Sequence, residues 1–229
     1  MKKLLAVAVF VGLGFLGLAQ TPVAVVNGEP ITKEELDNAA QLNQILFTLY
    51  YQYPRFAQTI LNTPEGKALL TRYQRDVLED LIIRKIQIQE ARARGITADP
   101  ARVNELLDQM LEQIKSYYGL SDEELAAELE KEGLTVEQFR SELQPHAEEQ
   151  ALVEALKAAV TAGITVSEDE ISAYYTANPG QFVDAQGNNL PLEQVHDKIA
   201  SLLASQKQET AWQEWLKQAR ESANVQINL

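Results

Sequence analysis

Start signals for helices recur along this chain at short intervals, and they constrain its fold more than any other feature. In a capping box, a serine or threonine and a glutamate or glutamine three residues later each accept a hydrogen bond from a backbone N–H that the first helical turn leaves unpaired. The sequence holds four such pairs: Thr32–Glu35, Ser121–Glu124, Thr135–Gln138 and Ser167–Glu170. A proline just after Thr63 and another just after Asp99 mark two further starts. These signals predict a mainly α-helical protein.

The apolar pattern inside the predicted helices indicates how they pack. Residues 64–94 carry apolar side chains on more than one face, as expected of a central, buried helix, and Gly95 is placed to end it. Residues 100–118 carry one apolar stripe, so that helix is expected to bury a single face. Further helices are predicted at 122–132 and 136–161.

Short strands are predicted at both ends of the chain. Residues 23–26 and 29–31 flank the dipeptide Asn27-Gly28, which strongly favours a two-residue hairpin turn. At the other end, apolar residues alternate with polar ones from Val225 to Leu229, which is strand spacing. A terminal strand needs a partner, and the strand near the N-terminus is the candidate.

A long helix is predicted between Pro191 and the terminal strand. Its apolar spacing lapses between Ala204 and Ala211 and resumes with Trp212 and Trp215. A helix that is polar in its middle and apolar at both ends is best explained as a strut that touches two parts of the molecule.

Residues 1–19 have the composition of a cleavable export signal. Lys2 and Lys3 precede an uncharged apolar run, and small residues at Gly17 and Ala19 suit cleavage after Ala19. The run is shorter than the roughly 20 residues of a spanning helix, although a retained membrane anchor is the alternative. We expect an exported or periplasmic protein with no stable membrane insertion once the signal is removed.

Composition excludes several kinds of chemistry and partner. The chain of 229 residues has no cysteine, so disulfides and thiolate catalysis cannot operate. Its formal net charge is −13, which disfavours nucleic acid as a partner because phosphate binding relies on a basic surface. The two histidines, His146 and His196, are expected to be solvated surface residues. We find no catalytic site, no cofactor site and no metal site in the sequence, since no acidic or histidine cluster has metal-ligand spacing.

Several short motifs, each loose by itself, form a fairly specific pattern through their order and spacing. They are Val25–Leu36, Leu78–Ile82 followed by Glu90-Ala91 and Gly95-Ile96, Leu125–Leu129, Gly133–Arg140 and Val166–Tyr175. This order resembles the SurA and PrsA chaperone family over nearly the whole chain after residue 19. The resemblance implies a helical domain like the SurA N-terminal domain. It also implies that the closing helix returns to the N-terminal helices and that residues 225–229 pair with residues 23–27.

One departure from the family concerns catalysis. A parvulin-type prolyl isomerase domain usually lies between the helix ending in Asn178-Pro179 and the closing helix, but only Val183–Asn189 separates Phe182 from Leu190 here. Seven residues form an ordinary loop, so we expect no isomerase domain and no enzyme. The expected domains are a signal peptide over 1–19, a helical core over 20–162, a connecting helix and loop over 163–189, and a closing helix and strand over 190–229 that pack on the core.

A group of aromatic residues is the candidate binding surface. Its members are Phe47, Tyr50, Tyr51, Tyr53 and Phe56, together with Tyr117 and Tyr118. Filling the core is the alternative for each, but neighbouring tyrosines on a helix cannot both face inward equally. We expect a chaperone that holds unfolded or partly folded envelope and outer-membrane proteins in an aromatic-lined cradle between the N-terminal helices and the closing helix. The alternative is a dedicated assembly scaffold that binds one partner or a second copy of itself.

Overall fold

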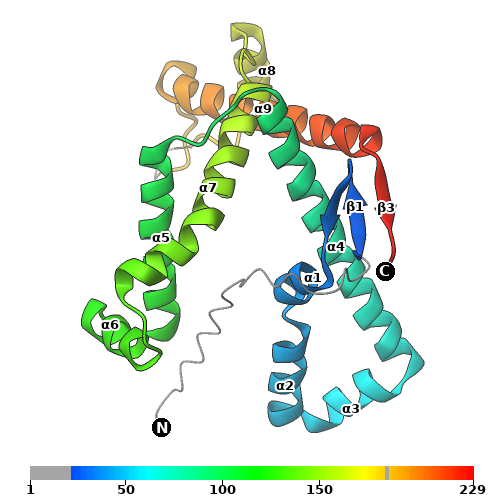
Figure 1. Ribbon diagram of the computed structural model, residues 1–229. Helices are drawn as coiled ribbons and strands as arrows, with labels where there is room; N and C mark the ends of the chain where they lie inside the picture. Colours follow the sequence, from blue (N-terminus) through cyan, green and yellow to red (C-terminus); the bar gives the residue numbers. More distant parts are fainter. Residues whose placement is uncertain (1–21, 184–185) are drawn as a thin grey trace. The chain divides into compact units, whose positions relative to one another are not determined.

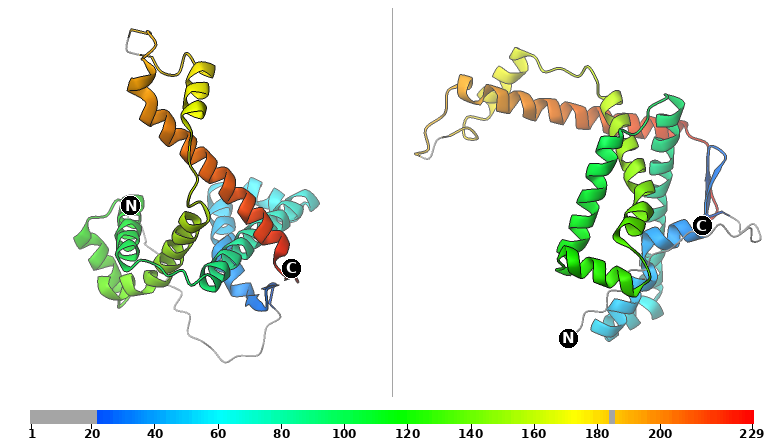
Figure 2. Two further views of the ribbon diagram at one scale, coloured as in Figure 1. Left: turned by 90° about the horizontal axis from the view of Figure 1, so that it is seen from above. Right: turned by 60° about the vertical axis from the view of Figure 1, so that its left-hand side comes forward.

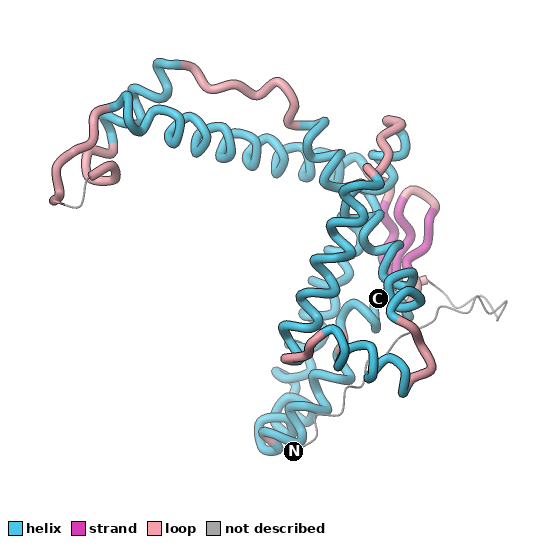
Figure 3. The backbone as a smooth tube through the Cα atoms, turned by 90° about the vertical axis from the view of Figure 1, so that its left-hand side faces the viewer, coloured by secondary structure: helices cyan, strands magenta, loops and turns pink. Residues whose placement is uncertain are grey.

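The computed structural model describes residues 22–183 and 186–229, so the predicted signal at 1–19 lies outside the described residues. The chain divides into two compact units. Unit 1 comprises the residues up to Ala155 together with Ala223–Leu229, and unit 2 comprises Leu156–Ser222. Helices dominate, and the strands of the described residues form one small sheet (Figures 1 and 3). The prediction of a mainly α fold with a small terminal β-pairing is confirmed.

The sheet in unit 1 joins the two ends of the chain. Strand β1 (Ala24–Val26) lies between β2 (Glu29–Ile31) and β3 (Val225–Ile227), and both pairings are antiparallel. Ala24 is opposite Ile227 and Val26 is opposite Val225. The predicted pairing of the terminal strand with the first strand is therefore confirmed.

Asn27 makes the turn between β1 and β2 and also fastens the terminal strand. Asn27 and Gly28 both have positive φ, 51° and 89°, as a tight hairpin turn of this type requires. The Asn27 side chain accepts the Asn224 N–H at 2.8 Å and donates to Gln89 at 2.9 Å. Gln89 in turn donates to the Val26 carbonyl at 3.0 Å. One short polar residue thus links three segments far apart in sequence.

The N-terminal helices of unit 1 follow the sheet. They are α1 (Lys33–Ala40), α2 (Leu42–Gln52), α3 (Pro54–Asn62) and α4 (Pro64–Ala93). The capping box predicted at Thr32 forms with Glu35. Tyr73 of α4 donates to the Ala40 carbonyl at 2.8 Å, which ties α4 to the end of α1. Helix α4 has its C-cap at Arg94, and Gly95 follows it with a φ of 69°, as predicted for the glycine that ends this helix; the Ile96 N–H returns to the Ala91 carbonyl.

A second group of helices in unit 1 consists of α5 (Pro100–Tyr118), α6 (Asp122–Lys131) and most of α7 (Val136–Val160). The apolar stripe of α5 packs on α7, with Val103, Leu106 and Leu107 against Ala147 and Ala151. Figure 2 shows α5 and α7 side by side with α6 across one end. The single buried face predicted for α5 is therefore confirmed.

Charged pairs reinforce the packing of α7. Arg102 of α5 contacts Glu154 of α7 at 2.7 Å, and this hydrogen bond holds the pKa of Glu154 below its usual value. Arg84 of α4 contacts Glu149 of α7 at 3.0 Å. Both pairs are substantially exposed, so each contributes little to stability by itself and mainly fixes the register between helices.

Unit 2 contains the end of α7, helix α8 (Glu168–Ala177) and helix α9 (Leu192–Ser222). The first part of α9 packs on α8 through Val195 and Ile199, which form a core with Ile171 and Phe182. The segment between the helices closes locally, since the Leu190 N–H donates to the Phe182 carbonyl at 2.7 Å. Phe182 lies beside the rings of Tyr174 and Tyr175 at 6.3 and 6.2 Å. The short connection predicted from the sequence therefore returns the chain directly to α9.

Exposed charges connect the elements of unit 2. Lys207 of α9 donates to both Glu170 oxygens at 2.8 and 3.0 Å and to the Thr165 carbonyl at 2.7 Å. The Lys207 ammonium and the Ser167 backbone N–H lower the pKa of Glu170 to about 2. His196 lies between Asp197 and Glu168, and its hydrogen bonds to them raise its pKa.

No described helix has the length and apolarity needed to cross a bilayer.

Candidate functional site

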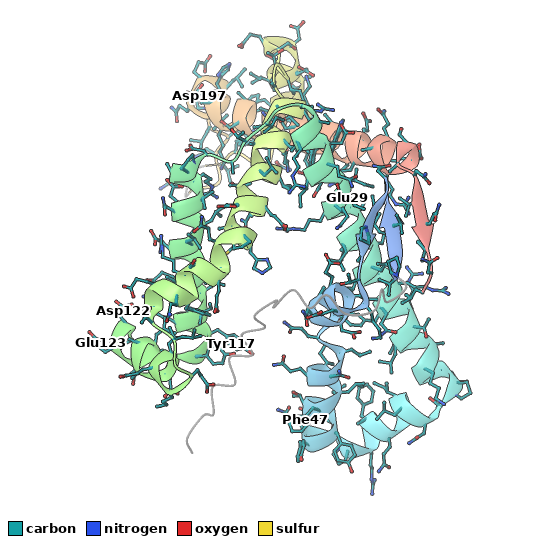
Figure 4. All side chains as sticks on the ribbon, in the orientation of Figure 1. Glu29, Phe47, Tyr117, Asp122, Glu123 and Asp197 are labelled. Carbon is teal, nitrogen blue, oxygen red and sulfur yellow. The ribbon has the colours of Figure 1, made fainter. Side chains whose placement is uncertain are left out.

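Helix α2 is apolar and yet buries none of its residues. Its sequence, Leu-Asn-Gln-Ile-Leu-Phe-Thr-Leu-Tyr-Tyr-Gln, contains no charged residue. Helices of globular proteins ordinarily bury an apolar face, whereas on α2 Leu42, Leu46 and Leu49 are only partly buried and the remaining residues are exposed, so this helix calls for a partner. Phe47 is labelled in Figure 4, where it lies on α2 at the end of the N-terminal helices. This helix is the strongest candidate for a binding element.

Five aromatic residues on α2, α3 and the bend between them form an exposed surface, here called the aromatic surface. Each is between 53% and 70% exposed: Phe47, Tyr50, Tyr51, Tyr53 and Phe56. With about 200 Å² for each side chain, these fractions leave roughly 600 Å² uncovered. The largest apolar patch on an ordinary monomer is about 300–600 Å² and is often functional. The aromatic surface is therefore at the upper end of what a protein leaves exposed.

The local sequence explains why α2 and α3 present these rings. Gln41 adopts a left-handed conformation with φ of 46°, which separates α1 from α2, and Pro54 starts α3 after the bend at Tyr53. Helix α3 then packs on α4 through Ala57 and Ile60, which are 0% and 7% exposed. The buried side of α3 holds the segment formed by α2 and α3 against α4, and α2 itself has no buried residue.

The rings of the aromatic surface contact one another. The Phe47 and Tyr51 ring centroids are 4.5 Å apart, and those of Tyr50 and Tyr51 are 6.0 Å apart with nearly perpendicular planes. Such contacts hold the rings in place without covering their outer faces. Both members of the Tyr50-Tyr51 pair are exposed.

Tyr117 and Tyr118 lie elsewhere, at the C-terminal end of α5. Their rings meet edge to face at 4.9 Å, and Tyr117 is 81% exposed while Tyr118 is half-buried. Figure 4 shows Tyr117 and Phe47 on separate groups of helices in unit 1. The structure thus divides the candidate residues into the aromatic surface and a smaller pair on α5.

Three exposed residues that sequence reasoning did not single out extend the apolar character of this region. They are Ile45 on α2, Leu61 on α3 and Leu69 on α4, with exposures of 41%, 37% and 56%. An aliphatic residue at helical spacing looks the same in sequence whether it faces a core or water. The absence of charge throughout α2 was a signal for Ile45 alone, because α3 and α4 both carry charged residues.

A groove of about 640 Å³ is a second feature of unit 1 that the sequence analysis missed. It lies where the loop between α4 and α5 meets α7 at Pro145, which stays inside the continuous helix although proline has no N–H to donate to the preceding turn. Apolar residues such as Ile96 and Leu152 line it together with Gln144 and Glu148, which hydrogen-bond to each other at 2.7 Å. A proline inside a predicted helix was the available signal.

The described residues contain no grouping of three histidine, aspartate or glutamate side chains that could hold a metal ion. His146 is exposed on α7, and both ring nitrogens of His196 face carboxylates rather than a nucleophile. What the geometry of the described residues offers is an exposed apolar surface for contact.

Comparison with known proteins concerns the family and the fold of the chain. The family model for the SurA-like N-terminal domain matches residues 3–153. Foldase protein PrsA of Clostridium botulinum strain Langeland is 25% identical over 166 residues, which cover 72% of this chain and 47% of that protein. Foldase protein PrsA of Clostridium kluyveri is 24% identical over 179 residues, which cover 78% and 51%. This chain therefore spans about half the length of these curated relatives.

A solved structure gives an independent view of the fold. It was described with PEB4 and Cj1289, two SurA-like chaperones of Campylobacter jejuni, and it matches 91% of this chain and 99% of its own at a TM-score of 0.53. The sequence identity is 14%, so the match concerns the fold alone. No parvulin domain is detected in this chain, which agrees with the short connection from Phe182 to Leu190. On the evidence of the family model and its chaperone relatives, the chain belongs to the SurA-like N-terminal domain family.

Proposed function

We propose that this protein is an exported holdase-type chaperone that binds unfolded or partly folded polypeptides of the cell envelope on the aromatic surface. The observation that supports the proposal most directly is helix α2, which is uncharged, rich in aromatic residues and without a buried residue. Family membership supports a chaperone role in general. Tyr117 and Tyr118 are proposed as a secondary contact for the same clients.

The size of the aromatic surface is suited to transient binding. Covering roughly 600 Å² at about 25 cal/mol/Å² contributes on the order of 15 kcal/mol before costs. Association and ordering cost about 4–15 kcal/mol. The remainder lies between about 0 and 11 kcal/mol, and a cost above about 7 kcal/mol, as expected when a flexible client is ordered on binding, leaves micromolar affinity or weaker. A chaperone that must release its clients needs binding of this strength, and rings with flat apolar faces accept many different side chains.

The proposal includes the absence of prolyl isomerase activity, because no parvulin domain is detected in the chain. It also includes export, which the composition of residues 1–19 and the exported character of SurA-like chaperones support. A standard prolyl isomerisation assay on a proline-containing peptide should show the uncatalysed rate. Turnover well above that rate would contradict this part of the proposal.

The central experiment compares two triple variants of the aromatic region. Tyr50→Ser, Tyr51→Ser and Tyr53→Ser together should weaken the suppression of client aggregation, measured by light scattering at several-fold molar excess over a chemically unfolded protein. The matched control replaces the exposed polar residues of the same helix, Asn43, Gln44 and Gln52, with serine. Because all six positions are exposed, both variants should keep the circular dichroism spectrum of the parent.

The outcomes separate chaperone action from the alternative of a dedicated scaffold. No suppression by the parent protein, or equal loss in both triple variants, would overturn the proposal. A stable homodimer in solution that protects the tyrosines from modification would instead favour self-association, since 600 Å² approaches the roughly 800 Å² that each partner buries in a standard interface. Capture of many unfolded clients from an envelope extract, and not of one folded partner, is the expected result.

A further inference from the structure

The two edges of the small sheet in unit 1 differ in their capacity to accept another strand. On β2, the one residue whose backbone groups point away from β1 is Pro30, which has no N–H. The Pro30 carbonyl accepts a hydrogen bond from Lys85 at 2.9 Å. The next outward N–H, that of Thr32, donates to Glu35 at 2.6 Å. From Pro30 to Thr32, each backbone group that points away from β1 is either missing or already hydrogen-bonded. The outer edge of β2 is therefore closed to pairing with another strand.

The β3 edge is open. Asn27 and Asn224 lie opposite each other and are hydrogen-bonded, as are Val23 and Asn228. Since bonded pairs alternate along an antiparallel ladder, the N–H and C=O groups of Val225 and Ile227 point away from β1. No other part of the described chain pairs with this side of β3.

The sequence of β3 lacks the features that usually protect an edge. Natural edge strands carry lysine, proline or an inward-pointing charge that blocks further pairing. Residues 224–229 contain neither a charged residue nor a proline, although the chain has a net charge of −13. Ile227 and Leu229 are 53% and 44% exposed. The closed edge at β2 shows that this sheet does carry such protection on one side only.

An added strand would extend the buried face of the sheet. Ile227 lies opposite Ala24, which is fully buried, so the Ile227 side chain is on the same face of the sheet as the core residues Ala24 and Val26. A segment paired with β3 would place every second side chain beside Ile227 on that apolar face. Backbone hydrogen bonds would hold any extended sequence, with a preference for apolar residues at alternate positions.

The size of the edge decides between a second copy of the chain and an extended segment. A stable dimer buries about 20–30 residues on each partner, whereas β3 is three residues long. An edge this short suits a weak contact made mainly by backbone groups. We propose that the outer edge of β3 binds an extended, uncharged segment of an unfolded client by strand addition. This inference rests on the proposed chaperone function and specifies how the client backbone is recognised.

The test uses the full chain and two synthetic octapeptides of alternating threonine and valine. One peptide is unmodified, and its matched control carries an N-methyl group on every residue, which removes the N–H donors of both edges so that neither edge can pair with β3. Amide exchange at Val225 and Ile227 is followed by NMR. At a peptide concentration ten times its Kd, mass action should slow the exchange of both amides about tenfold. The methylated peptide should leave both rates unchanged.

A pair of variants at Ile227 provides the second measurement. Because the Ile227 N–H points outward, Ile227→Pro removes it without breaking a bond to β1, and edge strands tolerate proline at such a position. Ile227→Val keeps the N–H. We expect Ile227→Pro to lose the protection of Val225 by the unmodified peptide and Ile227→Val to retain it, with both variants keeping the exchange rates of β1.

Each result is informative separately from the aggregation assay. Equal protection by both peptides, or no protection of Val225 and Ile227 at millimolar peptide, would overturn strand addition. If serine variants of the aromatic surface still abolish aggregation suppression in that case, the proposed chaperone function stands and only the inference about β3 fails. Concentration-dependent protection of β3 without peptide would show pairing with a second copy instead, and would also overturn the inference.

Discussion

Gly66 sets the angle at which α3, and with it the aromatic surface, leaves α4. It is buried in the first turn of α4, where its N–H donates to the Thr63 hydroxyl at 3.1 Å. A Cβ atom added at Gly66 would lie 2.1 Å from the Ile60 carbonyl oxygen and 2.4 Å from the Ile60 Cα. Both atoms belong to the backbone of α3, so a side-chain rotation cannot relieve the contact. We therefore expect Gly66→Ala to force α3 and α4 apart.

The magnitude follows from two opposing effects. Alanine is favoured over glycine inside a helix by about 1 kcal/mol. Overpacking costs about 1–3 kcal/mol, and a clash with backbone atoms belongs at the upper end of that range. The net expectation is a destabilisation of about 2 kcal/mol, which corresponds to roughly thirtyfold more frequent opening of the α3–α4 contact.

The assay has to report on unit 1 by itself. Both tryptophans of the chain, Trp212 and Trp215, lie on α9, so a probe within α3 and α4 themselves is needed. Hydrogen exchange measured by mass spectrometry on peptides from residues 54–93 reports directly on α3 and α4. Aggregation suppression should fall in parallel, because the aromatic surface loses its anchor.

A glycine without neighbours supplies the control. A Cβ at Gly180 would have nothing within 4 Å, and its φ is not positive, so Gly180→Ala should be neutral or slightly stabilising. If Gly66→Ala exchanges as slowly as the parent in residues 54–93, helix propensity outweighs the contact. The argument that Gly66 positions α3 would then be refuted.

Two further predictions concern one residue in each unit. Asn27→Ala removes the hydrogen bonds to Asn224 and Gln89 and leaves alanine at positive φ. We expect the sheet to lose about 2–3 kcal/mol of stability, measured as faster amide hydrogen exchange in β1 and β3. Unchanged exchange in these strands would contradict this prediction. The pKa of Glu170 is about 2, against an ordinary value of 4.5. Because the pKa is lowered in the folded state, the ionised Glu170 carboxylate stabilises unit 2 above pH 4.5, and this stabilisation is lost as the pH falls toward 2. Lys207→Met should reduce that acid dependence in urea titrations followed by tryptophan fluorescence, and an identical pH profile would count against the Lys207 contact.

Capping residues could be located from the sequence because their action is local. Thr32, Ser121 and Ser167 each bond to a backbone group within three residues, so neighbouring residues alone determine where these helices begin. The same holds for the Asn27-Gly28 turn, whose backbone needs positive φ at both positions. The pairing of β1 with β3 could not be derived from local sequence in this way. The alternating pattern of residues 225–229 indicates a strand that needs a partner, but it does not indicate which strand the partner is.

Burial of the aromatic residues could not be derived from the sequence. Tyr50 and Tyr73 are both tyrosines on predicted helices, yet Tyr73 bonds to the end of α1 and Tyr50 is exposed on α2. Which of them is covered depends on the bend at Tyr53 and on how closely α3 approaches α4. The groove beside Pro145 was missed for the same reason, since its walls come from α4, α5 and α7.

The sequence by itself determined the helical fold, the helix starts and the short connection between Phe182 and Leu190, because each depends on groups a few residues apart. Only the tertiary structure decided that α2 buries no residue, that Gly66 must be a glycine, and that Pro30 closes one edge of the sheet while Val225 and Ile227 leave the other open. These properties depend on which surfaces meet across the chain. Contact between distant segments determines what remains free to bind.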